Sequence, residues 1–160
     1  MQIGIILAFL GAAAAAVMSC IGSSIGVSMA GRAASGVVSE DPDKFIKCLV
    51  LQLLPGSQGI YGFIIAFLVL AKVNAFGTLA VLSSTAGVGI FASCIPMALG
   101  GFLSAIYQGK VAVAGIALVA KKPEEYVKGI LFTAMVETYA LLSFIISFIA
   151  VFVVNWTAVQ

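Results

Sequence analysis

Histidine is absent from these 160 residues, and charged residues are scarce. Without an imidazole, a zinc centre lacks its usual nitrogen ligand and a catalytic base near neutral pH lacks its usual carrier. Charged side chains make up 9% of the chain, against roughly 25% in soluble domains, while 62% of the residues are hydrophobic. The sequence therefore predicts a membrane protein that has no soluble catalytic domain, and we expect it not to be an enzyme.

Cysteine and net charge exclude further classes of protein. The three cysteines, Cys20, Cys48 and Cys94, are odd in number, widely spaced and embedded in apolar runs. This pattern predicts neither a disulfide framework nor a metal site, and small buried side chains are the simpler interpretation. A net charge of +2, carried by short stretches, gives nucleic-acid binding little support.

Long apolar segments dominate what remains. A membrane span needs about 20 predominantly apolar residues, so the chain has room for roughly four. Each of the two polar breaks, at about 39–44 and 120–125, places a proline at the start of a helix and acidic residues in its first turn. We expect an all-α membrane protein of four transmembrane helices, built from the apolar segments 3–37, 45–71, 76–119 and 127–154.

The basic residues predict an orientation in the cell membrane. Lys72 lies near the connection between the second and third segments, whereas the other seven lie in or near the two polar breaks: Arg32, Lys44, Lys47, Lys110, Lys121, Lys122 and Lys128. Because positive charge stays on the cytoplasmic side, we expect cytoplasmic loops and both termini outside, with Trp156 as an outer anchor. No basic residue precedes Arg32, so the first helix is expected to be retained rather than removed as a signal peptide.

The second half of the chain repeats the first at an offset of 81 residues. This register aligns Pro42 with Pro123, Lys47 with Lys128, and residues 63–67 with 144–148. A chance match between apolar sequences is the alternative, but the prolines and lysines match as well. We expect two tandem parallel helical hairpins, 1–74 and 75–160. Gly56 falls opposite Glu137, so the second hairpin alone carries an acid at that depth.

Small residues recur every four positions in the first and third helices. They are Gly22, Gly26, Ala30 and Ala34, followed by Gly89, Ser93, Gly101, Ala105 and Gly109. Such stripes allow helices to approach closely in lipid. They favour a ring of subunits in which helices 1 and 3 lie inside and the bulkier helices 2 and 4 outside. Close packing within one monomer is the alternative.

Glu137 is the most informative residue. It lies nine residues after Lys128 and nineteen before Trp156, about 14 Å and about 28 Å along a straight helix. A carboxylate at that depth costs several kcal/mol, so it is a functional candidate by default. The alternative is a structural carboxylate bonded to a neighbouring helix.

Neutral oxygen ligands lie at a comparable depth on other helices. Pro55 and Gly56 should disturb the second helix and free carbonyl oxygens, and the polar residues Ser57, Gln58 and Tyr61 follow them. Gln108 adds an amide from the third helix. One acid with several neutral oxygens suits a hard monovalent cation such as Na⁺, whereas a proton carrier needs only the acid. Both ions stay open at this point, with sodium favoured.

Four motifs resemble one known family, the proteolipid (K or c) subunits of V-type ATPases, and most closely its bacterial sodium-translocating members. They are LQLLPGSQGIYGF at 51–63, YQGKVAVAG at 107–115, AKKPE at 120–124 and AMVETYA at 134–140. The resemblance implies that Na⁺ is held by Glu137, Gln58, Gln108, the Ser57 hydroxyl and the Leu54 carbonyl, and that Tyr61 hydrogen-bonds the acid. Position 57 is often threonine in that family; serine keeps the oxygen and loses a methyl group.

The resemblance also implies a rotary mechanism. Copies of the chain would form a ring that turns with a central stalk docked on the cytoplasmic loops. A stator subunit would present a basic residue to Glu137 and loosen the ion. A small ion-coupled exporter is a more remote alternative, because it needs an aqueous cavity, usually with aromatic residues near the acid. Here Glu137 has Tyr61 and Tyr139 nearby but no tryptophan, and the glycine stripes favour close packing.

Overall fold

The computed structural model describes residues 3–153 and 155–156. The helices in this part of the chain are α1 (Ile3–Glu40), α2 (Phe45–Leu53), α3 (Ser57–Lys72), α4 (Ser84–Lys121) and α5 (Tyr126–Phe152), with 3₁₀ turns η1 (Pro42–Lys44), η2 (Leu54–Gly56) and η3 (Pro123–Glu125). Because η2 joins α2 to α3 end to end, these helices supply four segments long and apolar enough to cross a membrane. The predicted all-α fold with four spans is confirmed.

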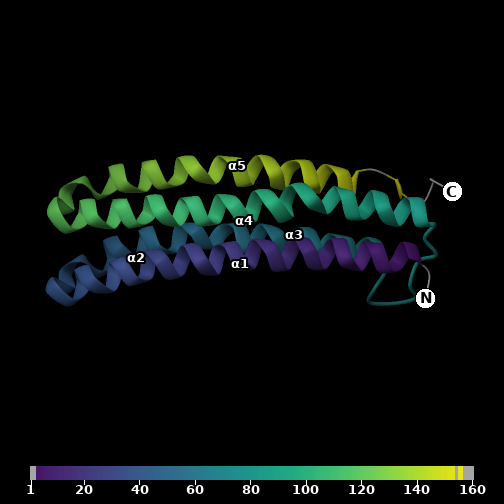
Figure 1. Cartoon of the computed structure of the whole chain (residues 1–160), viewed down its shortest axis with the longest axis horizontal. Helices are drawn as coiled ribbons and strands as arrows, with labels where there is room; N and C mark the ends of the chain where they lie inside the picture. The colour runs from purple at the N-terminus through teal and green to yellow at the C-terminus, as the bar shows by residue number, and fades with distance from the viewer. Residues whose placement is uncertain (1–2, 154, 157–160) are drawn as a thin grey trace.

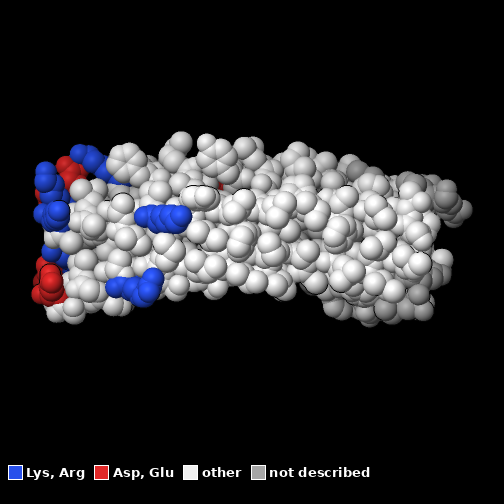
Figure 2. All heavy atoms as spheres, viewed as in Figure 1, with Lys and Arg blue, Asp and Glu red and all other residues white. Residues whose placement is uncertain are grey.

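The helices lie side by side along one long axis (Figure 1). α1 begins and α5 ends at one end of the molecule, and the α1–α2 and α4–α5 turns lie at the other. Charged side chains gather at the turn end (Figure 2). A helix of 38 residues, such as α1, is about 57 Å long, and the hydrocarbon core is about 30 Å thick. The charged turn end therefore projects out of the bilayer.

Glycine lets α1 and α4 pack closely along their lengths. A Cβ atom added to Gly22 would meet the backbone of Phe102, and one added to Gly26 would meet the carbonyl of Ala105. These parts of the small-residue stripes therefore pack helices within one chain, as the monomer alternative expects. α3 packs mainly on α1, and α5 packs mainly on α4. The first and third spans therefore pack against each other in the middle of the four-span bundle.

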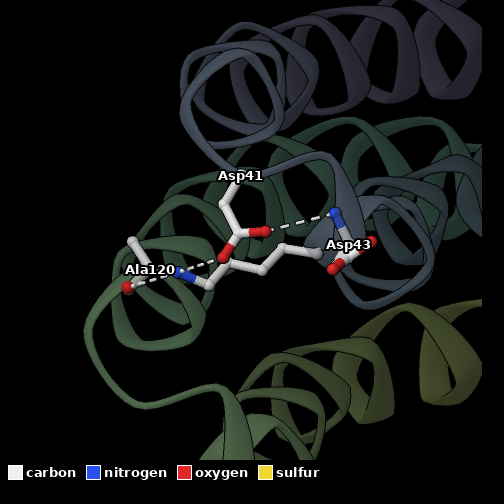
Figure 3. A network of polar contacts seen from close by, with 4 residues as sticks. Asp41, Asp43 and Ala120 are labelled. Carbon is white, nitrogen blue, oxygen red and sulfur yellow. Dashed lines mark hydrogen bonds and ion pairs between the residues drawn. The ribbon is translucent and has the colours of Figure 1, made fainter.

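A polar network ties the two turns together (Figure 3). Asp41 caps η1 by accepting a hydrogen bond of 3.2 Å from the Asp43 N–H, and it forms an ion pair of 3.2 Å with Lys44. The Lys44 ammonium donates a bond of 2.9 Å to the Ala120 carbonyl in the last turn of α4. As the sequence predicts, Pro42 begins the helical turn after the first break. The loop is shorter than 39–44, because α1 runs to Glu40.

The predicted start of the third helix is wrong. The apolar segment begins at residue 76, but α4 begins at Ser84, whose neighbour Ser83 caps it by accepting from the Ala86 N–H at 3.2 Å. In the connection before it, Asn74 adopts a φ of +53° and its side chain donates to the Thr78 carbonyl at 2.7 Å. Local turn chemistry thus overrides an apolar composition that also suits a helix.

Candidate ion-binding site

The η2 turn interrupts the second span where the sequence predicts a disturbed helix. Pro55 has no N–H to donate, and the backbone tightens into a 3₁₀ turn. The Leu54 carbonyl accepts the backbone N–H of Ser57 and also its hydroxyl, at 3.1 Å. The turn thus brings a carbonyl oxygen and a hydroxyl oxygen together on the second span.

A serine on α1 holds this turn from the other side. The Ser23 hydroxyl oxygen accepts a hydrogen bond of 2.8 Å from the Gly59 N–H. The same hydroxyl donates a hydrogen bond of 3.4 Å to the Gly56 carbonyl. Both groups belong to the interrupted stretch of backbone. Ser23 therefore ties α1 to the η2 turn and the first residues of α3.

Two buried amides join three spans. Gln58 and Gln108 are both 0% exposed, and the Gln58 amide nitrogen donates to the Gln108 amide oxygen. The Gln108 amide nitrogen donates in turn to the Thr133 carbonyl on α5 at 3.1 Å. The Ser57 hydroxyl lies 3.5 Å from the Gln58 amide oxygen. This arrangement fixes the orientation of both amides in an otherwise apolar bundle.

The carboxylate lies one helical turn further along α5 than Thr133. Glu137 is half-buried, and its Oε1 accepts a hydrogen bond of 2.6 Å from the Tyr61 hydroxyl. Tyr61 in turn lies one turn after Ser57 on α3. Within the described residues, Glu137 forms no hydrogen bond with Gln58 or Gln108. The structure therefore pairs the acid with Tyr61 and pairs the two glutamines with each other. The two pairs lie about one helical turn apart along the bundle.

The charge of this arrangement restricts what it can bind. The described residues contain no group of three His, Cys, Asp or Glu side chains placed to hold a metal ion. Glu137 is the one acid outside the turn regions, so a single bound positive charge neutralises the site. A carbonyl oxygen has two lone pairs, so the Gln108 oxygen can accept from Gln58 and still face a cation. The donor set fits a monovalent cation or a proton.

Comparison with known proteins decides the family. The family of the ATP synthase C subunit matches the chain twice, at residues 10–69 and 91–150. The chain belongs to this family. The two matches begin 81 residues apart, which is the register of the internal repeat, and they confirm the duplication; the boundaries 1–74 and 75–160 stay predictions.

Relatives of this chain occur in ATPases and ATP synthases of several kinds. The chain is 49% identical to the K subunit of the V-type sodium ATPase of Enterococcus hirae, over 92% of each chain. It is 37% identical to the K subunit of the A-type ATP synthase of Methanocaldococcus jannaschii, over 89% of this chain and 60% of that protein. It is 28% identical to the 16 kDa proteolipid of the V-type proton ATPase of Nephrops norvegicus, over 86% of this chain and 85% of that protein.

These likenesses make the chain a V-type ATPase proteolipid of the K type, a non-catalytic membrane rotor subunit. The alternative of a small exporter is wrong, because the family match covers most of the chain. Sodium and proton ATPases both occur among the relatives, so family membership alone does not choose the ion.

Two polar residues of the proteolipid site escaped the sequence reasoning. Thr133 supplies its carbonyl to Gln108, and Ser23 holds the η2 turn. The internal repeat carries a signal for the second, because Ser23 aligns with Ser104 in the 81-residue register. Ser104 does a similar task in the second hairpin, donating to the Val136 carbonyl at 3.1 Å.

Proposed function

We propose that this proteolipid carries Na⁺ across the membrane as one subunit of the rotor ring of a V-type ATPase. Glu137 neutralises the ion, and oxygens of Gln58, Gln108, Ser57 and Leu54 replace its water. The observation that carries the proposal is the 2.6 Å bond between Tyr61 and Glu137, one helical turn from the buried pair of amides. The bond fixes the acid beside neutral oxygens from two other spans.

Energetics explain why rotation would carry the ion. A site that holds Na⁺ on Glu137 has no net charge and can pass through lipid. An empty ionised site would expose a charge whose cost is several kcal/mol in the bilayer centre. A basic residue on a stator subunit would substitute for the ion and release it. The ring therefore turns only with loaded sites facing lipid.

The charged turn end faces the cytoplasm in this proposal, and both termini lie outside. The turns at 39–44 and 120–125 have most of the basic residues in or near them and project beyond the hydrocarbon, which suits contact with a central stalk. Helices 1 and 3 would line the inside of the ring, with helices 2 and 4 outside.

A proton-carrying rotor is the second candidate function. A proton needs only Glu137 itself, because protonation neutralises the acid while Oε1 can still accept the hydrogen bond from Tyr61. The buried amides favour sodium, because their oxygens can coordinate Na⁺, whereas a proton bound to Glu137 does not need them.

Transport by the whole ATPase in sealed vesicles tests the proposal. ATP should drive ²²Na⁺ uptake that persists when a protonophore is added, and Glu137→Gln should abolish it. Thr78→Val, at an exposed position in the connection between α3 and α4, should leave uptake unchanged. ATP-driven acidification without ²²Na⁺ uptake would overturn sodium in favour of the proton.

A further inference from the structure

Ser23 of α1 is buried, and it bonds to the second span on both sides of two proposed ion ligands. Its hydroxyl oxygen accepts from the Gly59 N–H at 2.8 Å, and the hydroxyl donates to the Gly56 carbonyl at 3.4 Å. In the sequence, Gly56 and Gly59 bracket Ser57 and Gln58. One side chain therefore holds the backbone of both residues that supply side-chain oxygens from this span.

α1 also packs closely on the η2 turn itself. A Cβ atom added to Gly26, about one helical turn after Ser23, would meet the ring of Pro55 at 2.9 Å. One added to Gly59 would meet the Ser23 hydroxyl at 3.3 Å. Because Gly59 is buried, its N–H cannot exchange the Ser23 oxygen for bulk water. Loss of this hydroxyl should therefore shift the backbone beside Gln58 toward another acceptor.

Three oxygens move with this stretch of backbone. The Leu54 carbonyl accepts the Ser57 hydroxyl at 3.1 Å, and that hydroxyl lies 3.5 Å from the Gln58 amide oxygen. All three groups lie within residues 54–58, so a change in the η2 turn displaces them together. Ser23 thus contacts the one segment that supplies every neutral ligand expected from the second span.

The second hairpin contains the same device. Ser104 is the equivalent of Ser23 in the 81-residue register, and it donates at 3.1 Å to the carbonyl of Val136, the residue before Glu137. The acid itself is not repeated, since Glu137 aligns with Gly56. In each hairpin, a serine on the first helix therefore holds the ion-binding stretch of the second helix, although the ion-binding groups differ.

We propose that Ser23 is a positioning residue of the ion site, which fixes the η2 turn and does not itself touch the ion. This inference rests on the Na⁺ site proposed above. Oxygens that are already in place need no further ordering when the cation binds, so releasing the turn should lower the affinity for Na⁺. A proton on Glu137 does not use the η2 oxygens, and its binding should not depend on Ser23.

Protection of Glu137 from a hydrophobic carbodiimide, in membranes that contain the whole ATPase, tests this role. Ser23→Ala should raise the Na⁺ concentration that gives half-protection by about 3- to 10-fold. The labelling rate without Na⁺ should stay the same, because Glu137 and its partner Tyr61 lie outside the η2 turn. Ser23→Cys keeps a weak donor and acceptor at this position and should give a smaller increase, which serves if the alanine variant fails to assemble.

A matched control lies one helical turn earlier on α1. Ser19 is fully buried, and its hydroxyl donates to the Met97 carbonyl on α4 at 3.1 Å. Ser19→Ala removes a hydrogen bond of the same kind without touching the η2 turn. That variant should lose stability and keep the half-protection concentration of the parent. If Ser23→Ala or the assembled Ser23→Cys does the same, Ser23 is only structural and the proposal is overturned.

A double-mutant cycle shows whether Ser23 acts through the turn. Ser57→Ala removes one of the oxygens that the turn places, and an absent oxygen cannot be misplaced. The loss of Na⁺ affinity in the double variant should therefore be smaller than the product of the two single losses. A loss equal to the product would overturn the proposed route through η2.

The parent enzyme separates this inference from the proposed function. If Na⁺ protects Glu137 in the parent and the Ser23 variants need no more Na⁺ than the parent does, the sodium site stands and the positioning role is wrong. If Na⁺ does not protect the parent, the sodium site and the role of Ser23 are both wrong.

Discussion

The Tyr61 hydroxyl donates a hydrogen bond of 2.6 Å to Oε1 of Glu137, and this bond joins the second membrane span to the fourth. The two residues are 76 positions apart in the chain. A hydrogen bond to a charged group contributes about 1.5–3 kcal/mol to stability, and its contribution is larger where water is excluded. Tyr61 therefore fixes where the single acid of the site points.

Replacing Tyr61 by phenylalanine should weaken Na⁺ binding by about 10- to 100-fold, because the carboxylate loses its orienting donor. Phenylalanine keeps the ring contact with Phe144, whose centroid lies 5.4 Å away, so the fold should survive. Equilibrium binding of ²²Na⁺ to the purified protein measures the change. The matched control is Tyr139→Phe, at a position 68% exposed on α5, which should bind as the parent does. Equal affinities for the two variants would contradict the role given to Tyr61.

Gln108→Ala should lower both Na⁺ affinity and stability. The substitution removes one oxygen from the site and leaves the Gln58 amide nitrogen without its acceptor, which costs about 1–3 kcal/mol. Ser147→Ala is the matched control, because the buried Ser147 hydroxyl accepts the Met97 N–H at 3.0 Å, ten residues further along α5 than Glu137. That variant should melt earlier in detergent and still bind Na⁺ normally. If Gln108→Ala behaves in the same way, the amide is structural.

Substitutions at Ser57 should separate its oxygen from its size. Ser57→Thr keeps the hydroxyl and its bond to the Leu54 carbonyl, so Na⁺ affinity should change by less than about threefold. Ser57→Ala removes the oxygen and should weaken binding by about tenfold. Isothermal titration with NaCl at constant ionic strength distinguishes the two. Equal loss in both variants would mean that packing, rather than coordination, decides the affinity.

Gly26→Leu should prevent the hairpins from packing, because a Cβ there meets the Ala105 carbonyl and the Pro55 ring. Backbone atoms cannot move aside as the end of a side chain can, and the loss should exceed about 3 kcal/mol. Gly36→Leu is the matched control on the same helix, since a Cβ at Gly36 has nothing within 4 Å. The yield of folded protein after detergent extraction compares them. Similar yields would show that α1 and α4 can separate at little cost.

Residues with few physical alternatives were predictable from the sequence. Gln58, Gln108 and Glu137 stand out because polar groups are expensive within a membrane and need partners there. Proline likewise marks the η1 and η2 turns, since it cannot donate to a helix. The repeat gave the parallel hairpins, because prolines and lysines matched at the same offset as the apolar residues. For each of these residues, the amino-acid type at one position is enough to predict its effect, whatever the residue contacts.

Contacts between distant positions were not predictable in the same way. Spacing along α3 and α5 does not say that Tyr61 meets Glu137, and the family resemblance supplied that pairing. Ser23 looked like one more small residue, although it holds the η2 turn through Gly59. The start of α4 was misplaced because residues 76–83 are as apolar as a helix, and the Ser83 cap carries a weak signal. Packing between spans decides these features.

Labelling of Glu137 by a hydrophobic carbodiimide tests the central claim most directly, because the reagent attacks only a protonated acid that is free of a bound cation. Near neutral pH and at constant ionic strength, Na⁺ should slow the labelling rate in proportion to site occupancy, while K⁺ should leave it unchanged. Gln108→Ala should need a higher Na⁺ concentration for the same protection. If lithium, sodium and potassium ions all leave the rate unchanged, Glu137 carries a proton, and the sodium site described here is wrong.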